Sequence, residues 1–357
     1  MEKVVYLLGA GFSAPLGLPA TNDFLVKSKD MFFENPQKYS HFDDVFNTIK
    51  QMSVCKNYYD SDLFNIEEIL SVLEMQNHLS DSENQSSFLQ FICDVIAFYT
   101  PSFDIDADLN SGNWHGFVFG NDKLTRGYGF FVGSIHNLQF IRKEIIDHGR
   151  MLAQHSFIKD SNSQFNYSIV TLNYDMVLEN ICKYAVQKFH TDLRFTDNFD
   201  ADEKKTTNPV ALAKLHGSID SGIIVPPTWN KNLHKSVIQS WRLAYKLLTE
   251  TNHIRIIGYS LPTADSYVRY LLKAAAMHSP HLKSIDVICL DPKGDVKQRY
   301  DEFINFKYYR FFNAKIEEYL STIYHKSVPE IVGSLVPLNL NKLEDAHHEF
   351  VEKQRNV

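Results

Sequence analysis

Residues 4–14 read VVYLLGAGFSA, and this stretch decides the fold. Val4 to Leu8 form a short, continuous and partly β-branched apolar run, which is typical of a strand buried on both faces of a parallel sheet. The run ends in Gly9–Ala14, which matches the G-x-G-x-x-A pattern of a dinucleotide-binding turn. Because glycine has no Cβ atom, the backbone of such a turn can approach a pyrophosphate closely.

Two features depart from an ordinary Rossmann turn. Pro15, Gly17 and Pro19 interrupt the long helix that should follow the glycines, and no acidic residue ends a second strand about 20 residues further on. The sequence therefore indicates a dinucleotide-binding fold of another type.

Later in the chain, strand-like runs occur at residues 167–171, 210–215, 254–257 and 285–290, and helical patterns follow most of them. Strands that alternate with helices predict right-handed crossovers and a mostly parallel sheet covered on both faces. We therefore expect an α/β fold with a doubly wound, mostly parallel sheet. Residues 1–25 and 160–325 are expected to form this core, which an insertion splits.

The insertion, residues 26–159, is expected to be helical, because apolar residues recur at helical spacing, as from Ile66 to Leu73. Within it, residues 111–133 carry six glycines among aromatic residues, which favours a long mobile loop or lid. Residues 326–357 are expected to form a C-terminal helical tail in which His347 and His348 are solvated.

Composition and charge exclude several classes of protein. The 357 residues include 36 basic and 43 acidic side chains, a net charge of −7, which argues against direct binding of nucleic acid. No apolar run approaches the about 20 residues of a membrane span, and no signal peptide is recognisable, so we expect a cytoplasmic protein without membrane contact. The cysteines are far apart and form no C-x-x-C, which favours buried reduced thiols: they are Cys55, Cys93, Cys182 and Cys289.

Polar turns follow the predicted strands. Thr171–Asp175 contains Asn173 and Asp175, Lys214–Ser218 contains His216, and Gly258–Ser260 and Asp291 follow the last two strands. Ligands of open parallel sheets bind beyond the carboxyl ends of the strands, so we expect these turns to converge. Histidine suits proton transfer near neutral pH. Structural roles stay open, since Asn and Asp also cap helices and single histidines are commonly structural.

An ordered set of motifs resembles the NAD-binding domain of the sirtuin (SIR2) family. It resembles the bacterial SIR2-like branch of that family more than the protein deacylases. The motifs are, in order, Gly9–Ser13 with Gly17–Pro19, Thr171–Asp175, His216-Gly217 and Gly258–Ser260. Residues 65–70, NIEEIL, also look like this branch. The resemblance covers Val4 to about Asp291 without the insertion. Sirtuin deacylases usually carry a four-cysteine zinc ribbon between the last two motifs. This chain has no cysteine from Gly217 to Tyr259, so we expect no zinc ribbon and no metal.

The resemblance implies that NAD is the substrate and is hydrolysed to nicotinamide and ADP-ribose. Asn173 would hydrogen-bond the ribose or the attacking water, Asp175 would orient the pocket from behind, and His216 would accept a proton from a ribose hydroxyl or from water. Gly258, Ser260 and Asp291 would line the adenosine half. The complete set of implied NAD-binding residues is Gly9, Ala10, Gly11, Ser13, Pro19, Asn22, Thr171, Gly217, Gly258, Ser260 and Asp291.

Relatives with this zinc-free arrangement are typically effectors of bacterial anti-phage defence that deplete NAD, in the manner of abortive infection. The resemblance therefore implies an enzyme that is activated by assembly into a homo-oligomer or by a separate partner, such as a HerA-like ATPase or a nucleotide-sensing protein. Two alternatives stay open: an NAD-dependent deacylase or ADP-ribosyltransferase, and a catalytically silent sensor of ADP-ribose-type nucleotides. Trp229, in the segment 224–231 that replaces the zinc ribbon, could stack on a ring or pack the insertion against the core.

Overall fold

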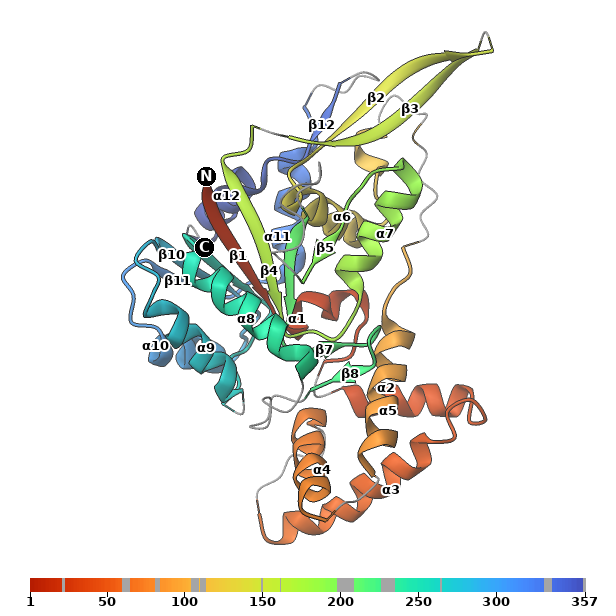
Figure 1. Cartoon of the computed structure of the whole chain (residues 1–357), viewed down its shortest axis with the longest axis vertical. Coiled ribbons are helices and arrows are strands. Elements are labelled where there is room, and N and C mark those ends of the chain that lie inside the picture. Colours follow the sequence, from red (N-terminus) through yellow and green to blue (C-terminus); the bar gives the residue numbers. More distant parts are fainter. Residues whose placement is uncertain are drawn as a thin grey trace.

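A seven-stranded sheet forms the centre of the computed structural model, which describes residues 1–20, 23–59, 65–80, 84–103, 109, 114–148, 150–160, 162–197, 209–225, 235–263, 265–330 and 336–355 (Figure 1). Every pair of neighbouring strands is parallel. In spatial order the strands are β11 (Tyr309–Phe312), β10 (Ser284–Ile288), β9 (His253–Ile257), β1 (Glu2–Leu8), β4 (Phe165–Thr171), β6 (Val210–Lys214) and β5 (Phe195–Thr196). The predicted α/β fold with a parallel sheet is confirmed.

From Val4 to Leu8 the central strand β1 is apolar and buried, because both of its faces are covered there. Val4, Tyr6 and Leu8 belong to one hydrophobic core, and Val5 and Leu7 belong to the other. On the second face lie α8 (Lys235–Glu250), α9 (Ser266–Ala276) and α10 (Asp295–Phe303). On the first face lie α6 (Lys123–Ile135), α7 (Val177–Phe189), α11 (Ile316–Ser327) and α12 (Leu343–Arg355).

The order of the strands fixes where a ligand can bind. Within the sheet, β4 and β6 lie on one side of β1. The chain then crosses over, and β9 and β10 lie on the other side of β1. The carboxyl end of β1 is therefore the point at which the strand order reverses, and such points are the usual ligand sites of open α/β sheets. The short helix α1 (Ala10–Ser13) begins there.

Four helices of the predicted insertion form a lobe beyond these strand ends (Figure 1). We call them the helical lobe: α2 (Phe24–Glu34), α3 (Phe42–Met52), α4 (Ile66–Ser80) and α5 (Asn84–Tyr99). Aromatic side chains hold the lobe together, since the ring of Phe91 lies 4.6 Å from that of Phe42 and 5.8 Å from that of Phe24. Within the described ranges, no helix combines the length and apolar character that a bilayer span requires.

The rest of the predicted insertion contains strands where helices were expected. β2 (Leu138–Asp147) and β3 (Arg150–Lys159) form an antiparallel hairpin that projects from the body of the molecule (Figure 1), and β12 (Leu338–Asn339) pairs with β2. At the base of the hairpin Phe140 faces Phe157 across the strands, with ring centroids 4.4 Å apart, and both rings pack on Phe189. Cross-strand aromatic pairs of this kind stabilise a strand pairing that local spacing does not reveal.

The prediction of a mobile glycine-rich loop is wrong for residues 123–133, which lie in the buried helix α6. Its glycines permit close packing: a Cβ atom at Gly129 would lie 2.2 Å from Phe119, and one at Gly133 would lie 2.3 Å from Leu340. The helix begins with a cap in which Asp122 accepts a hydrogen bond of 2.7 Å from the backbone N–H of Thr125. Residues 111–113 of the predicted loop lie outside the described residues.

In the predicted tail, helix α12 turns one face toward the sheet. His348 is exposed, as expected, but the prediction that His347 is solvated is wrong, because only 5% of it is exposed. Leu343, Ala346 and Phe350 share its buried face. A polar residue in this amphipathic pattern faces inward because the sheet and α11 offer it hydrogen-bonding partners.

Those partners form a buried polar chain, and the donor of each hydrogen bond can be assigned. Arg255 on β9 donates to the hydroxyl of Tyr6 at 2.6 Å, and Tyr6 can then donate to Tyr319 at 2.9 Å. Tyr319 lies 3.2 Å from Nδ1 of His347, whose Nε2 lies 3.1 Å from Asp286. The ionised carboxylate of Asp286 can only accept, so Nε2 of a neutral His347 donates to it. Nδ1 of His347 then accepts from Tyr319, and Tyr319 accepts from Tyr6.

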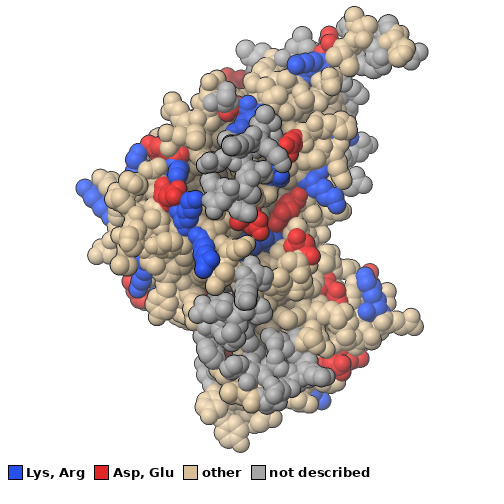
Figure 2. Space-filling model, in the orientation of Figure 1, with Lys and Arg blue, Asp and Glu red and all other residues tan. Residues whose placement is uncertain are grey.

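Arg255 also forms a buried ion pair that fixes α12 to the sheet. Its guanidinium donates two hydrogen bonds to Glu344, at 2.9 and 2.5 Å, and the hydroxyl of Tyr167 donates to the same carboxylate at 3.0 Å. The Arg255 side chain is 2% exposed. On the surface, by contrast, Figure 2 shows basic and acidic side chains side by side over the visible face.

We expect Glu344→Gln to destabilise the fold strongly, because it leaves the Arg255 charge buried without its counter-charge. Removing one partner of a buried pair costs about 3–5 kcal/mol. The measurement is urea unfolding at neutral pH. Glu352→Gln, in an exposed pair with His348 on the same helix, is the matched control and should change the free energy of unfolding by less than about 1 kcal/mol. Equal stability of the two variants would contradict a stabilising role for the ion pair.

The stability of the fold should also depend on pH through His347. Burial lowers the pKa of His347 to about 4, from 6.5 in an ordinary histidine. Between these values the unfolded chain binds a proton that the folded chain does not, so stability is complete above about pH 6.5 and falls as the pH drops toward about 4. The full loss is roughly 3 kcal/mol. Urea unfolding across this range should show a flatter pH dependence for His347→Gln than for wild type, whereas His348→Gln should follow wild type.

Candidate functional site

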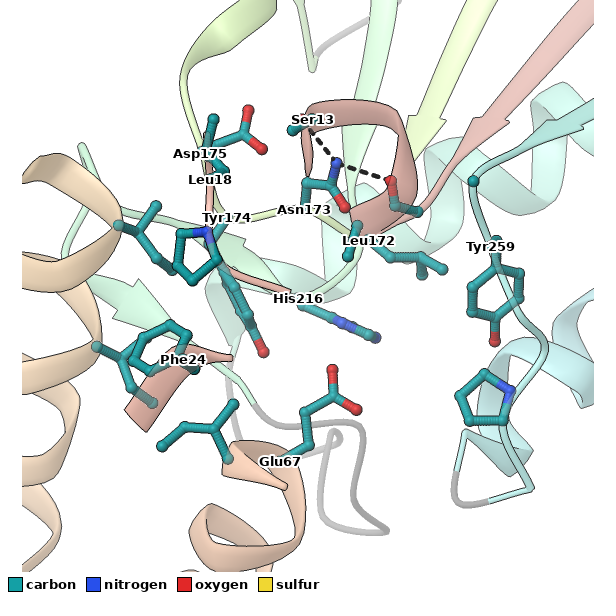
Figure 3. Close-up of a pocket in the computed structure, with 18 of the residues that line it drawn as sticks. Ser13, Leu18, Phe24, Glu67, Leu172, Asn173, Tyr174, Asp175, His216 and Tyr259 are labelled. Atoms are coloured by element: carbon teal, nitrogen blue, oxygen red, sulfur yellow. Dashed lines mark hydrogen bonds between the residues drawn. The ribbon is translucent and has the colours of Figure 1, made fainter. Parts of the chain in front are cut away.

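Two adjoining cavities lie at the carboxyl ends of the central strands. The inner cavity, drawn in Figure 3, is lined by residues of the glycine turn, by Asn173 and Asp175 after β4, by His216 after β6 and by the turn after β9. The outer cavity lies over the ends of β9 and β10 and the start of α11. Segments far apart in the sequence therefore meet at the edge where the strand order predicts a ligand site.

The glycines of the first turn are required by its packing against the turn after β9. The backbone N–H of Gly9 donates to Ile257 at 3.0 Å, and that of Gly11 donates to Gly258 at 2.9 Å. A Cβ atom at Gly9 would lie 2.7 Å from Tyr259, and one at Gly258, where φ is +64°, would lie 2.3 Å from the nitrogen of Phe12. Side chains at these positions would push the two turns apart.

Asn173 is oriented by two hydrogen bonds that its side-chain nitrogen donates. Its Nδ2 donates to the carbonyl oxygen of Gly9 at 3.0 Å and to Oγ of Ser13 at 3.1 Å (Figure 3). A carbonyl oxygen can only accept, so the nitrogen must face it. With both amide hydrogens donated, the side-chain oxygen is the atom that Asn173 can offer to a ligand.

Asp175 lies behind Asn173 and is 8% exposed. Its carboxylate accepts a hydrogen bond of 3.1 Å from the backbone N–H of Val177, at the start of α7, and another from Ser13. Burial raises the pKa of Asp175 above its ordinary value. Asp175 thus contributes to the start of a helix and also contacts the serine that holds Asn173, so the structural and the functional interpretation are compatible.

His216 is 2% exposed and has a buried carboxylate beside it. Its Nε2 lies 3.9 Å from Oδ1 of Asp265, whose other oxygen accepts a hydrogen bond of 2.8 Å from the hydroxyl of Tyr259. Asp265 directly precedes α9, but its side chain makes no capping hydrogen bond there. Burial and the adjacent Asp265 raise the pKa of Tyr259 well above its ordinary value. The ring of Tyr174 lies 6.0 Å from the imidazole.

Most of the predicted site residues line one of the two cavities. The predicted catalytic residues Asn173, Asp175 and His216 line the inner cavity. The predicted NAD-binding residues that also line it are Gly9, Ala10, Ser13, Pro19, Gly258 and Ser260. Gly11 lines the outer cavity.

Three predicted residues line neither cavity, and their ligand contacts stay predictions. Thr171 accepts a hydrogen bond of 3.1 Å from the backbone of Asn173, and Asp291 accepts one of 2.8 Å from the backbone of Lys297 in α10. Gly217 has a φ of +86° and lies against the carbonyl oxygen of Ile223. The predicted residues Asn22 and Trp229 lie outside the described residues.

Sequence reasoning missed the wall that the helical lobe contributes. Glu67 and the apolar side chains Phe24, Ile66, Leu70, Ile92 and Ile96 complete the inner cavity from α2, α4 and α5. Asp265 and Tyr259 were also missed as partners of His216. Their signal is weak: both follow β9 in a glycine-containing turn, but only the folded chain shows that they face the end of β6.

One family model matches part of this chain. The model of the family described as "SIR2-like domain" matches residues 167–324, from β4 to α11. Among solved structures the chain is similar to a crystal structure of Sir2 in complex with the inhibitor EX-527, 2'-O-acetyl-ADP-ribose and a deacetylated p53 peptide. That similarity has 10% sequence identity and a TM-score of 0.31, and it covers 90% of this chain and 92% of that chain. No curated protein matches the sequence.

Proposed function

We propose that this chain, whose residues 167–324 form a SIR2-like domain, is an NAD glycohydrolase that cleaves the bond between nicotinamide and ribose. The observation that carries the proposal is that Asn173 and His216, from separate segments, line one cavity beside the glycine turn. SIR2 enzymes use NAD, so the family match supports NAD as the substrate. Hydrolysis to nicotinamide and ADP-ribose is the step that we add.

The chemistry needs a positioned water and a base. The bond from C1′ of the ribose to the pyridinium nitrogen breaks, and its electron pair leaves with neutral nicotinamide. The ribose becomes oxocarbenium-like, and the oxygen of a water molecule bonds to C1′ while His216 accepts the proton. The side-chain oxygen of Asn173 accepts a hydrogen bond from that water or from a ribose hydroxyl. The carbonyl oxygen of Gly9 and the hydroxyl of Ser13 hold Asn173 in this orientation, and Asp175 in turn holds Ser13.

The dinucleotide would extend across both cavities. Ala10 and Ser260 line the inner and the outer cavity, so a molecule in both would pass between the two glycine turns. The reacting ribose would lie beside His216, and the adenosine half would lie over the ends of β9 and β10. This placement agrees with the sequence-based assignment of Gly258 and Ser260 to the adenosine side.

The sequence favours hydrolysis over transfer to a protein. No cysteine occurs from Gly217 to Tyr259, so the zinc ribbon that sirtuin deacylases carry there is missing. Our proposal also includes, on the sequence resemblance, a cytoplasmic role in anti-phage defence by depletion of NAD. It further includes activation through a homo-oligomer or through a separate partner, such as a HerA-like ATPase or a nucleotide-sensing protein.

Purified protein should convert NAD to nicotinamide and ADP-ribose, measured by chromatography. Asn173→Ala and His216→Ala should each lower kcat by about 10²-fold or more, because a positioned base or water contact is commonly worth that much. His278→Ala, an exposed histidine after α9, is the control and should behave as wild type.

Other outcomes of this experiment identify the alternatives. Nicotinamide release that requires an acylated peptide would indicate a deacylase. Binding of ADP-ribose without turnover, in the chain together with its cellular partners, would indicate a sensor and would contradict hydrolysis.

Asp265→Asn should lower kcat by at least about tenfold. The carboxylate lies 3.9 Å from Nε2 of His216, where it stabilises the positive charge that the imidazole gains when it accepts the proton. Tyr259→Phe, which leaves the carboxylate in place, should have a smaller effect. The helix α9 should be unaffected, because Asp265 makes no side-chain cap. Wild-type kcat in Asp265→Asn would contradict this role, and an equal loss in Tyr259→Phe would indicate that the pair only supports the structure of the turn.

A further inference from the structure

We propose that Glu67, from the helical lobe, is a further catalytic residue whose carboxylate contacts the reacting ribose. This inference rests on the proposed cleavage of NAD and adds a residue that the glycine turns and strand ends do not supply. The helical lobe would then contribute to the chemistry as well as form a wall of the inner cavity.

The first turn of α4 holds Glu67 in place. Oδ1 of Asn65 accepts hydrogen bonds from the backbone N–H groups of Glu67, at 3.0 Å, and of Glu68, at 3.2 Å. This cap fixes the start of the helix, and a carboxylate in the first turn is favoured by the helix dipole. In Figure 3 the carboxylate of Glu67 points into the inner cavity toward His216, and Asn173 lies on the other side of the imidazole.

Glu67 also lies where the two cavities join. Five residues line both: Ala10, Glu67, Gly258, Ser260 and Pro262. The other four are uncharged, so Glu67 is the one charged side chain among the five. A dinucleotide that occupies both cavities must pass it.

The charge of Glu67 determines which part of the dinucleotide can lie there. A pyrophosphate is negatively charged and would be repelled by a carboxylate, whereas ribose hydroxyls can donate hydrogen bonds to it. The ribose therefore lies beside Glu67, and the pyrophosphate lies toward the glycine turns. This register also brings C1′ to the side of the cavity where His216 is located.

The same carboxylate is suited to the charge that develops during cleavage. As the bond to nicotinamide breaks, positive charge moves from the pyridinium ring to the ribose, where a nearby carboxylate stabilises it. The wall of the inner cavity beside Glu67 is apolar, with Phe24, Leu70 and Ile92 from the same lobe. A dinucleotide that fills both cavities would displace the water there, so this interaction would be screened little. Glu67 thus interacts more strongly with the transition state than with bound NAD.

The test compares two neighbouring glutamates. Glu67→Gln and Glu68→Gln alter adjacent residues whose N–H groups share the Asn65 cap, but Glu68 lines neither cavity. We expect Glu67→Gln to lower kcat by about 10²-fold or more, as the loss of one charge-stabilising group commonly does, and Glu68→Gln to stay within about twofold of wild type. Glu67→Asp, which keeps the charge but shortens the side chain, should fall between them.

Binding and folding are measured on the same variants. Equal melting temperatures of the two glutamine variants, with ADP-ribose binding retained in calorimetry, would place the loss in the chemical step. Wild-type kcat and KM in Glu67→Gln would overturn this inference and leave the proposed function intact. Failure of the wild-type chain to cleave NAD would instead overturn the proposed function, and this inference with it. If Glu67→Gln does not fold, wild-type activity in Glu67→Asp and Glu67→Ala would overturn the inference, and a graded loss would support it.

Discussion

The site depends on two backbone turns that pack against each other without intervening side chains. Gly9 and Gly11 after β1 lie against Gly258 after β9. Their N–H groups donate main-chain hydrogen bonds to Ile257 and Gly258. Sterically this is a demanding contact, because a single methyl group at any of the three positions would meet backbone atoms. This contact makes the two turns rigid. The carbonyl oxygen of Gly9 in the first turn orients Asn173, and the turn after β9 brings Asp265 beside His216.

The face of the sheet that packs against α12 is held by a different kind of interaction. There, Arg255, Glu344, Tyr6 and Asp286 form a buried, hydrogen-bonded set that fixes α12 to the central strands. A set of this type is costly to disrupt, and the polar groups are matched as donors and acceptors. The candidate site therefore lies on a core whose central strands are fixed at one edge by close backbone packing and on one face by buried charges.

The sequence predicted what local pattern determines. The strands β1, β4, β6, β9 and β10 are short apolar runs that end in turns, and the motif order placed Asn173 and His216 at their ends. It could not predict features that depend on distant partners. The hairpin of β2 and β3 depends on aromatic pairs such as Phe140 with Phe157. The glycines of α6 appear to be loop formers until Phe119 and Leu340 are seen to pack on them. His347 is buried because Asp286 on β10 and Tyr319 on α11 offer it hydrogen bonds. Glu67 lines the cavity from an insertion whose own pattern shows only an amphipathic helix.

The division of the cleft between two parts of the chain has a mechanical consequence. One wall belongs to the sheet, with Asn173 and His216, and the other belongs to the helical lobe, which carries Glu67. A rigid rotation of the lobe by a few degrees would change the width of the entrance and the position of that carboxylate together. The entry of substrate and the catalytic position of Glu67 would thus depend on the same movement. A molecule that binds the outer surface of the lobe could therefore switch both on or off together.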